Sequence, residues 1–267
     1  MPSPAPSADM DPMARLVEIM ARLRDPDGGC PWDIEQSYGT IAPYTIEEAH
    51  EVADAIEREA WGELEGELGD LLLQVVYFAQ MGREDGHFDF SSVARAIGDK
   101  MVARHPHVFG DESNEKSSEQ QVRDWEVQKA KERASKGEVR VLDGVAKGLP
   151  ALMRAQKLQK RAARVGFDWN NPRQVLDKIT EEAAELAAAG DPDAVEDEFG
   201  DLLFAVVNLG RHLNVDAEQA LRRTNAKFER RFNFVEDALG KEGKSPSQAT
   251  LDEMEAHWQS AKTARTP

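Results

Sequence analysis

The chain has 267 residues, of which 40% are hydrophobic and 31% are charged, and its formal net charge is −17. Such an acidic surface repels nucleic acid on average, so we expect no nucleic-acid partner, whereas a bound cation would still admit a small anionic substrate. The single cysteine, Cys30, excludes a disulfide within the chain, and the longest apolar runs, near Leu71–Ala79 and Leu202–Val207, are too short to cross a bilayer. We therefore expect a cytoplasmic protein without a membrane partner.

The first half predicts a series of helices after a disordered tail at residues 1–10. Apolar residues recur with a helical period over Met13–Leu23, and the Pro- and Gly-rich segment Asp25–Asp33 predicts a turn. Ser118, with Gln121 three residues later, is typical of a capping box that begins a helix. The further helices of this half are expected over Ile41–Ala60, Glu63–Gly82, Phe90–Arg104 and Ser118–Arg133.

The second half also predicts helices only. Residues 135–150 carry three Gly and a Pro without clear periodicity, so they are expected to connect two domains. Asn171-Pro172 and Asp191-Pro192 each combine a capping side chain with a proline suited to the first helical position. No segment shows the alternation of a strand. The remaining helices are expected over Leu149–Ala163, Asp216–Leu239 and Gln248–Ala264.

Four acidic side chains of the second half recur at helical spacing. Glu182 and Glu185 lie three residues apart on one predicted helix, and Glu198 and Asp201 repeat this spacing on the next, so each pair shares a face. Asp201 begins an apolar run, which would place its carboxylate beside buried residues. Acids gathered in a partly dry place cannot all stay ionised unless cations neutralise them. An all-oxygen site suits Mg²⁺, with Mn²⁺ as a possible substitute, and such ions commonly serve phosphates.

The first half repeats both motifs, with the acids Glu48, Glu51, Glu67 and Asp70, and the second motif with the apolar run after it matches at every offset. A lone EExxE segment is usually a solvated helix face, and duplication could preserve a core, but a core does not need its acids. We therefore predict a metal site in at least one half. Gly69 and Gly200, inside the acid-bearing helices, suggest a close approach of helices. Outside the acids, the repeat pairs Lys100, Arg104 and Trp125 with Lys227, Arg231 and Trp258.

The basic and aromatic residues allow more than one interpretation. Lys227, Arg230 and Arg231 alone would suggest a solvated helix face, but beside a metal site they would bind phosphates, as would Lys178 one turn before Glu182. Trp258 suits a core or lid position and could also stack on a nucleobase.

A histidine in the first half suggests a different metal. Glu47 and His50 form the ExxH spacing of di-iron carboxylate bundles. The second half has Ala184 at the place of His50, so the histidine is not part of the common design and the di-iron hypothesis fails.

Taken together, these motifs resemble a known family. EExxE, twelve residues and then ExxD is the signature of the all-α nucleoside triphosphate pyrophosphohydrolases, and the chain is most similar to the two-domain MazG proteins from about Leu16 to Lys262. The resemblance implies Mg²⁺-dependent cleavage of a nucleoside triphosphate to the monophosphate and pyrophosphate, on a helical scaffold that dimerises, with activity in the C-terminal unit. The segments that carry it, besides the acids, are Cys30–Asp33, Leu142–Gly144, Val165–Trp169 and Lys227–Phe232.

We predict an all-α fold, a tandem repeat of two related helical-bundle domains at residues 11–134 and 151–264, joined by the connector 135–150 and assembled as a homodimer. Glu182, Glu185, Glu198 and Asp201 would hold Mg²⁺ while water attacks the α-phosphate of a nucleoside triphosphate, and Glu181 could orient or deprotonate that water beside Glu182. The catalytic residues are thus expected to be Glu181 and Glu182, and the substrate-binding residues Lys178, Lys227, Arg230, Arg231 and Trp258.

The first-half acids would form a second, non-catalytic set, serving dimer contacts or binding a regulatory nucleotide.

Two other functions remain open at this point. A nucleotide-sensing regulator without turnover is the alternative to an enzyme that controls the nucleotide pool, and a purely structural acidic adaptor is a third hypothesis. Release of pyrophosphate would separate the enzyme from both.

Overall fold

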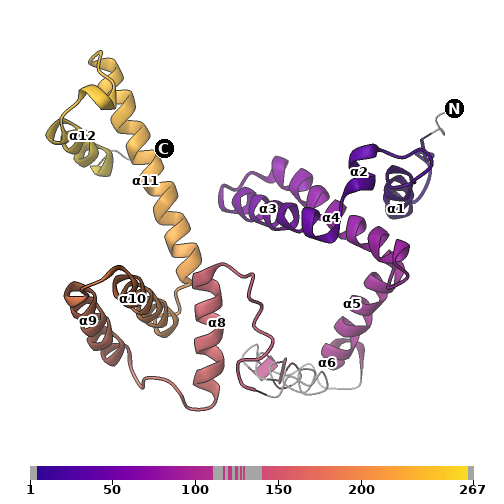
Figure 1. The fold of residues 1–267 in the computed structure, drawn as a ribbon, viewed down its shortest axis with the longest axis horizontal. Coiled ribbons are helices and arrows are strands. Elements are labelled where there is room, and N and C mark those ends of the chain that lie inside the picture. The colour runs from indigo at the N-terminus through magenta and orange to yellow at the C-terminus, as the bar shows by residue number, and fades with distance from the viewer. Residues whose placement is uncertain are drawn as a thin grey trace. The chain divides into compact units, whose positions relative to one another are not determined.

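The computed structural model describes residues 5–110 and 140–263, together with residues 117, 120, 121, 124, 125, 127 and 129. These residues form helices and turns, with no strand among them, which confirms the all-α prediction. They belong to two compact units, Met1–Gln128 and Lys129–Pro267 (Figure 1). Most of the helix predicted over 118–133, residues 1–4 of the predicted tail and residues 135–139 of the predicted connector lie outside the described residues.

In the first unit, capping side chains fix where three of the six described helices begin. Asp11 Oδ1 accepts from the Ala14 amide at 3.0 Å, and Asp89 forms a capping box with Ser92. Ser37 caps the third helix, which therefore begins before the predicted Ile41. The helices are α1 (Pro12–Leu23), α2 (Pro31–Glu35), α3 (Tyr38–Glu57), α4 (Trp61–Glu84), α5 (Phe90–Arg104) and α6 (Pro106–Phe109).

The link between α3 and α4 corrects one prediction. The sequence predicted helices over Ile41–Ala60 and Glu63–Gly82, with Trp61-Gly62 as the break between them, but α4 begins at Trp61. The break lies at Glu59 instead, which has a left-handed φ of 56° and ends the preceding helix. The two acid-bearing helices of this unit are therefore joined by a short turn and pack side by side (Figure 1).

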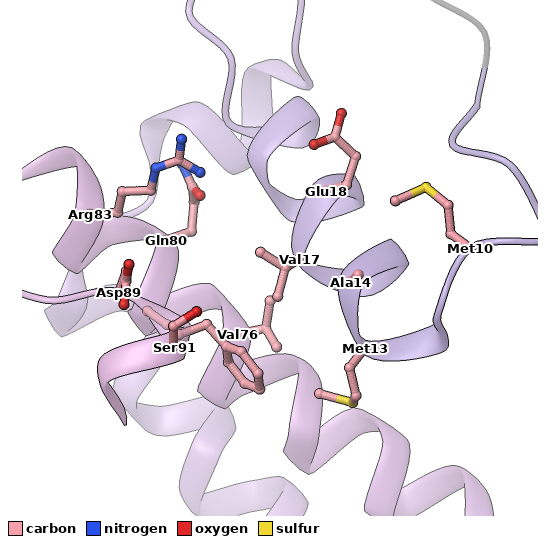
Figure 2. A pocket seen from close by; sticks show the side chains of 12 residues that line it. Met10, Met13, Ala14, Val17, Glu18, Val76, Gln80, Arg83, Asp89 and Ser91 are labelled. Carbon is pink, nitrogen blue, oxygen red and sulfur yellow. The ribbon is translucent and has the colours of Figure 1, made fainter. Parts of the chain in front are cut away.

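The core of the first unit lies between α1, α3 and α4. Tyr77 is 4% exposed, and its hydroxyl donates to the Asp33 carbonyl at 2.8 Å, which ties α2 to α4. The end of the segment predicted as a turn over Asp25–Asp33 is thus helical. A cavity of about 440 Å³ remains between α1, α4 and α5, where Glu18, Arg83 and Asp89 surround apolar side chains (Figure 2). The buried core residues are Met20, Ile41, Val76, Tyr77 and Met81.

The second unit repeats this plan. Asn171, Asp191 and Asp216 each cap a helix through side-chain acceptors, at or next to the predicted starts. The last helix begins at Leu251 rather than Gln248, because a short 3₁₀ turn precedes it. The elements are α8 (Ala151–Arg164), α9 (Pro172–Ala188), α10 (Pro192–His212), α11 (Ala217–Lys241), η1 (Pro246–Gln248) and α12 (Leu251–Thr263).

Within the second unit, α9 and α8 both pack against α10, whereas α11 diverges from α10 and carries α12 on it (Figure 1). An ion pair between Lys244 and Glu253 fastens the turn between α11 and α12. No helix among the described residues combines the length and apolar character needed to cross a membrane. The buried apolar residues include Val175, Ala205, Val207, Val235 and Leu239.

Candidate functional site

In the second unit, carboxylates from α9 and α10 converge. One oxygen each of Glu182, Glu185 and Glu198 lies within 4.8 Å of the others. Two oxygens bound to one Mg²⁺ at about 2.1 Å lie at most about 4.2 Å apart, so small side-chain shifts would let all three share an ion. An all-carboxylate donor set is also the chemistry that Mg²⁺ and Mn²⁺ prefer. The residues present therefore fit a hard divalent cation.

The electrostatics of this cluster favour a bound cation. Burial raises the pKa of Glu198, and the nearby charges of Glu185, Glu182 and Asp201 raise it further. Asp201 is thus close enough to repel Glu198, although it stands outside the tight group of three. Because the repulsion falls away when a positive charge is added, the cluster has a physical reason to bind one.

A lysine already neutralises part of this cluster. Lys178 Nζ lies 2.6 Å from Glu182 Oε1 and 2.9 Å from Glu181 Oε1, and the Glu182 side chain is only 5% exposed. The hydrogen bonds to Glu182 and then Glu181 raise the pKa of Lys178, which keeps the ammonium charged. Glu181, predicted as a proton acceptor for water, is therefore paired with Lys178 at the edge of the cluster.

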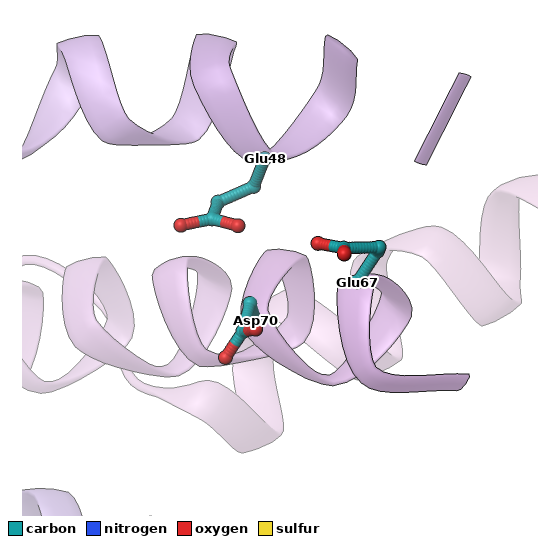
Figure 3. Close-up of side chains that lie close together, drawn as sticks. All are labelled: Glu48, Glu67 and Asp70. Atoms are coloured by element: carbon teal, nitrogen blue, oxygen red, sulfur yellow. The ribbon is translucent and has the colours of Figure 1, made fainter. Parts of the chain in front are cut away.

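The first unit holds a matching cluster made of different members. Glu48 on α3 points toward Glu67 and Asp70 on α4, with one oxygen of each within 4.8 Å of the others (Figure 3). Burial is the largest cause of the raised pKa of both Glu48 and Glu67. Glu51 lies outside the three but adds to both shifts. Thus each unit gathers three of its four predicted acids tightly and keeps the fourth beside them.

The glycines of the acid-bearing helices do not have the role that we predicted. A Cβ built at Gly69 or at Gly200 would meet no atom within 4 Å, apart from atoms of its own helix and neighbours. A close approach of helices within one chain therefore does not explain them, and that interpretation is wrong. Both positions instead face open space on the helix that carries two of the acids.

The predicted substrate-binding residues fall into two places. Lys178 lies at the acid cluster, whereas Lys227, Arg230, Arg231 and Trp258 lie on the α11–α12 hairpin, which leads away from α9 and α10 (Figure 1). On that hairpin the Arg231 guanidinium lies 5.7 Å from the centre of the Trp258 ring, a cation–π contact.

The first unit repeats this cation–π contact at the matching positions. The Arg104 guanidinium lies 6.0 Å from the centre of the Trp125 ring. The repeat therefore preserves this pair of side chains as well as the acids.

Comparison with known proteins identifies the family. The model of the MazG nucleotide pyrophosphohydrolase domain matches twice, at residues 36–109 and 170–235, and each match contains one acid cluster. The chain belongs to the MazG nucleotide pyrophosphohydrolase family. This confirms the resemblance predicted from the motifs and the tandem arrangement of two related all-α domains.

Relatives that match most of this chain agree with the family assignment. A nucleoside triphosphate pyrophosphohydrolase of Escherichia coli K12 is 53% identical over 95% of this chain and 98% of its own length. The nucleoside triphosphate pyrophosphohydrolase/pyrophosphatase MazG of Thermotoga maritima is 43% identical over 92% of this chain and 94% of its own length. The Bacillus subtilis protein YabN is 41% identical over 91% of this chain, which spans 50% of that longer protein.

The sequence did not predict a cavity in the second unit, beside the segment 170–235 that matches the MazG model. A cavity lies between α8 and α10, and two buried amide side chains, Gln159 and Asn208, line it. The only signal in the sequence was Asn208 itself, a polar residue where the repeat places Tyr77.

Proposed function

We propose that this MazG protein hydrolyses nucleoside triphosphates to the nucleoside monophosphate and pyrophosphate. The observation that carries the proposal is the convergence of Glu182, Glu185 and Glu198 within 4.8 Å, on two helices inside a segment that matches the family. The names of the Escherichia coli and Thermotoga maritima relatives support the same reaction. A role in controlling or cleaning the nucleotide pool would follow from this chemistry.

Glu182, Glu185 and Glu198, with Asp201 beside them, would hold Mg²⁺, and Mn²⁺ would be a substitute. The bound ions would offset the charge of the triphosphate and activate an attacking water. Burial and then the neighbouring carboxylates raise the pKa of Glu198, and a bound cation would offset both effects, which supports this assignment.

The residues around the acids would orient substrate and water. Lys178 is held between Glu181 and Glu182, so it is positioned to bind a phosphate oxygen once a cation neutralises Glu182. Glu181, released from Lys178, would accept the proton of the water that attacks the α-phosphate. Glu181 and Glu182 are therefore the proposed catalytic residues, with Glu182 also a metal ligand.

A homodimer would complete the site. Phe199, Leu203 and Val206 form one stripe on α10, and their exposures of 52%, 41% and 46% are high for large apolar side chains. A second copy packed on this stripe would bury it. It would also supply an α11–α12 hairpin, with the substrate-binding residues Lys227, Arg230, Arg231 and Trp258, to an acid cluster from which the hairpin of the same chain diverges.

The first unit would bind a metal or nucleotide without turnover, or serve dimer contacts. It keeps an acid cluster at Glu48, Glu67 and Asp70, but the position of Lys178 is occupied by Tyr44 and that of Arg230 by Ala103. This difference favours a regulatory site there. A chain in which neither unit turns over nucleotide, a pure sensor, is the alternative function.

Release of pyrophosphate tests the proposal. The purified chain is incubated with a panel of ribo- and deoxynucleoside triphosphates, with Mg²⁺ and with EDTA. We expect pyrophosphate and monophosphate in equal amounts, only with the metal. Nucleotide binding without release of pyrophosphate would leave the sensor, and neither binding nor release would overturn both functions.

A further inference from the structure

The second unit contains a cavity that the acid cluster does not use. It has a volume of about 550 Å³, which is within the range of small-molecule sites, and lies between α8, the turn at residues 165–169 and α10. Its walls are mainly apolar and aromatic, with few polar groups. The lining residues that matter here are Gln159, Asn208, Phe167, Trp169 and Phe204.

Two buried amides give the cavity a polar edge. Gln159 is 5% exposed, and its Nε2 donates to the Phe204 carbonyl at 2.8 Å. Its Oε1 is buried and accepts no hydrogen bond from the residues that the structure describes. Asn208 is also buried, and its Oδ1 accepts from Arg211 Nη2 at 3.4 Å, which leaves the amide NH₂ to donate. Because buried polar groups are normally paired, Gln159 Oε1 is available to a donor from a molecule bound in the cavity.

The first unit shows that this space can be filled by the chain itself. The offset that relates Glu198 to Glu67 relates Asn208 to Tyr77. The Tyr77 ring is buried in the core, and its hydroxyl donates to the Asp33 carbonyl in α2. In the second unit, Asp168 in the turn after α8 pairs with Arg211 and His212, and the smaller Asn208 leaves the space open. The exchange of Tyr77 for Asn208 therefore accounts for a cavity at this place in the second unit.

We propose that this cavity binds a nucleobase. A planar ring would lie against the aromatic side chains Phe167, Trp169 and Phe204, while an N–H at its edge would donate to Gln159 Oε1 and a neighbouring ring or carbonyl acceptor would receive the Asn208 NH₂. Each nucleobase carries donors and acceptors side by side at its edge, whereas a hydrocarbon would leave Gln159 unpaired. The choice of a nucleobase among heterocycles rests on the proposed function, because a nucleotide enzyme meets these rings.

The base can come from two sources. Phe204 follows Asp201 by three residues on α10, so the cavity opens about one helical turn from the acids. The base could belong to the triphosphate held by the acids, or to a separate nucleoside or nucleotide bound beside it. Both share the same chemistry in the cavity, and the experiment below distinguishes them.

Adenosine tests the proposal, because it carries a base without phosphates. Titration of the full chain with adenosine in EDTA, followed by calorimetry, should show saturable binding. Gln159→Met removes the unpaired acceptor and should weaken binding about three- to tenfold. Phe167→Ala truncates a side chain that is 82% exposed, so it should leave the fold intact and weaken stacking about fivefold or more. Asn208→Tyr should abolish binding by filling the space, and circular dichroism checks that it folds.

The source of the base is found by repeating the titration with Mg²⁺ and a saturating α,β-methylene ATP, which cannot be cleaved at the α-phosphate. Displacement of adenosine means that the cavity takes the substrate's base, and simultaneous binding means a second site. No saturable binding of adenosine to the wild type, or binding that Asn208→Tyr and Phe167→Ala leave unchanged, would overturn the proposal. These readouts need no turnover, so the proposal can fail while pyrophosphate release persists, and the reverse.

Discussion

Replacing Glu198 by Gln, with Glu67→Gln as its matched control, tests which unit works. The two residues occupy the same place in the repeat, and each supplies one of three oxygens that lie within 4.8 Å of one another. Loss of one preorganised charged group at a reacting centre commonly costs about 10²–10³ in kcat. We expect Glu198→Gln to lose at least about a hundredfold in pyrophosphate release, and Glu67→Gln to retain most of the activity.

The reason for this asymmetry lies beside the acids. Lys178 bridges Glu181 and Glu182, whereas Tyr44 stands at the matching position of the first unit. A charged contact to a phosphate commonly strengthens binding about ten- to a hundredfold. The acid cluster of the first unit lacks such a contact, whereas Lys178 can provide it in the second unit.

Thermal unfolding with and without the metal shows whether activity is lost for the expected reason. An ion at ten times its Kd stabilises the fold by about 1.4 kcal/mol, which raises the Tm by roughly 3–6 °C. Glu198→Gln should remain helical and show a smaller rise with Mg²⁺, because part of the rise comes from the second cluster. The expectation that only the second unit is active is wrong if Glu67→Gln, still folded, is as inactive as Glu198→Gln.

Three further predictions follow from the site. Reaction in ¹⁸O-water should label the monophosphate alone, as attack at the α-phosphorus requires, and label in pyrophosphate would identify a different hydrolase. Burial and neighbouring acids raise the pKa of Glu198, so ionising this carboxyl lowers the stability of the folded state. In EDTA the Tm should therefore fall as the pH rises from the ordinary Glu pKa of 4.5 through the raised value. The fall in Tm should be smaller in Glu198→Gln, and smaller for the unchanged chain in Mg²⁺. Lys178→Met should raise KM for the triphosphate more than Lys157→Met, an exposed control on α8, and equal effects would exclude a phosphate contact.

Helix ends with side-chain caps were predictable from sequence, because a capping residue acts on its own neighbours. Asn171 Oδ1 accepts from the amides of Arg173 and Gln174 at 3.0 and 3.2 Å, as its position before a proline predicted. The start of α4 was not predictable in this way. It depends on a left-handed backbone at Glu59, a residue type that seldom adopts that conformation.

The acids were predictable as a set but not as a geometry. Spacing along two helices placed four acids on facing sides, and each unit does bring its acids together. Which three of them meet depends on how the helices cross and on the side-chain rotamers. For this reason Asp70 joins the tight group in the first unit, whereas Asp201 stands outside that of the second.

The differences between the two units indicate where ligands bind. The second unit has Lys178 in place of Tyr44 and Asn208 in place of Tyr77. Burying a large side chain such as Tyr77 contributes about 1.5–3 kcal/mol to the stability of the fold. A smaller residue at this position is therefore expected where the open space has another use. Asn208→Tyr should therefore raise the Tm of the chain while it removes adenosine binding. A gain in stability with adenosine binding intact would mean that Asn208 is a tolerated packing defect. A gain in stability together with loss of adenosine binding is the result that a ligand site in this cavity requires, because Asn208 then lowers stability and keeps the site open.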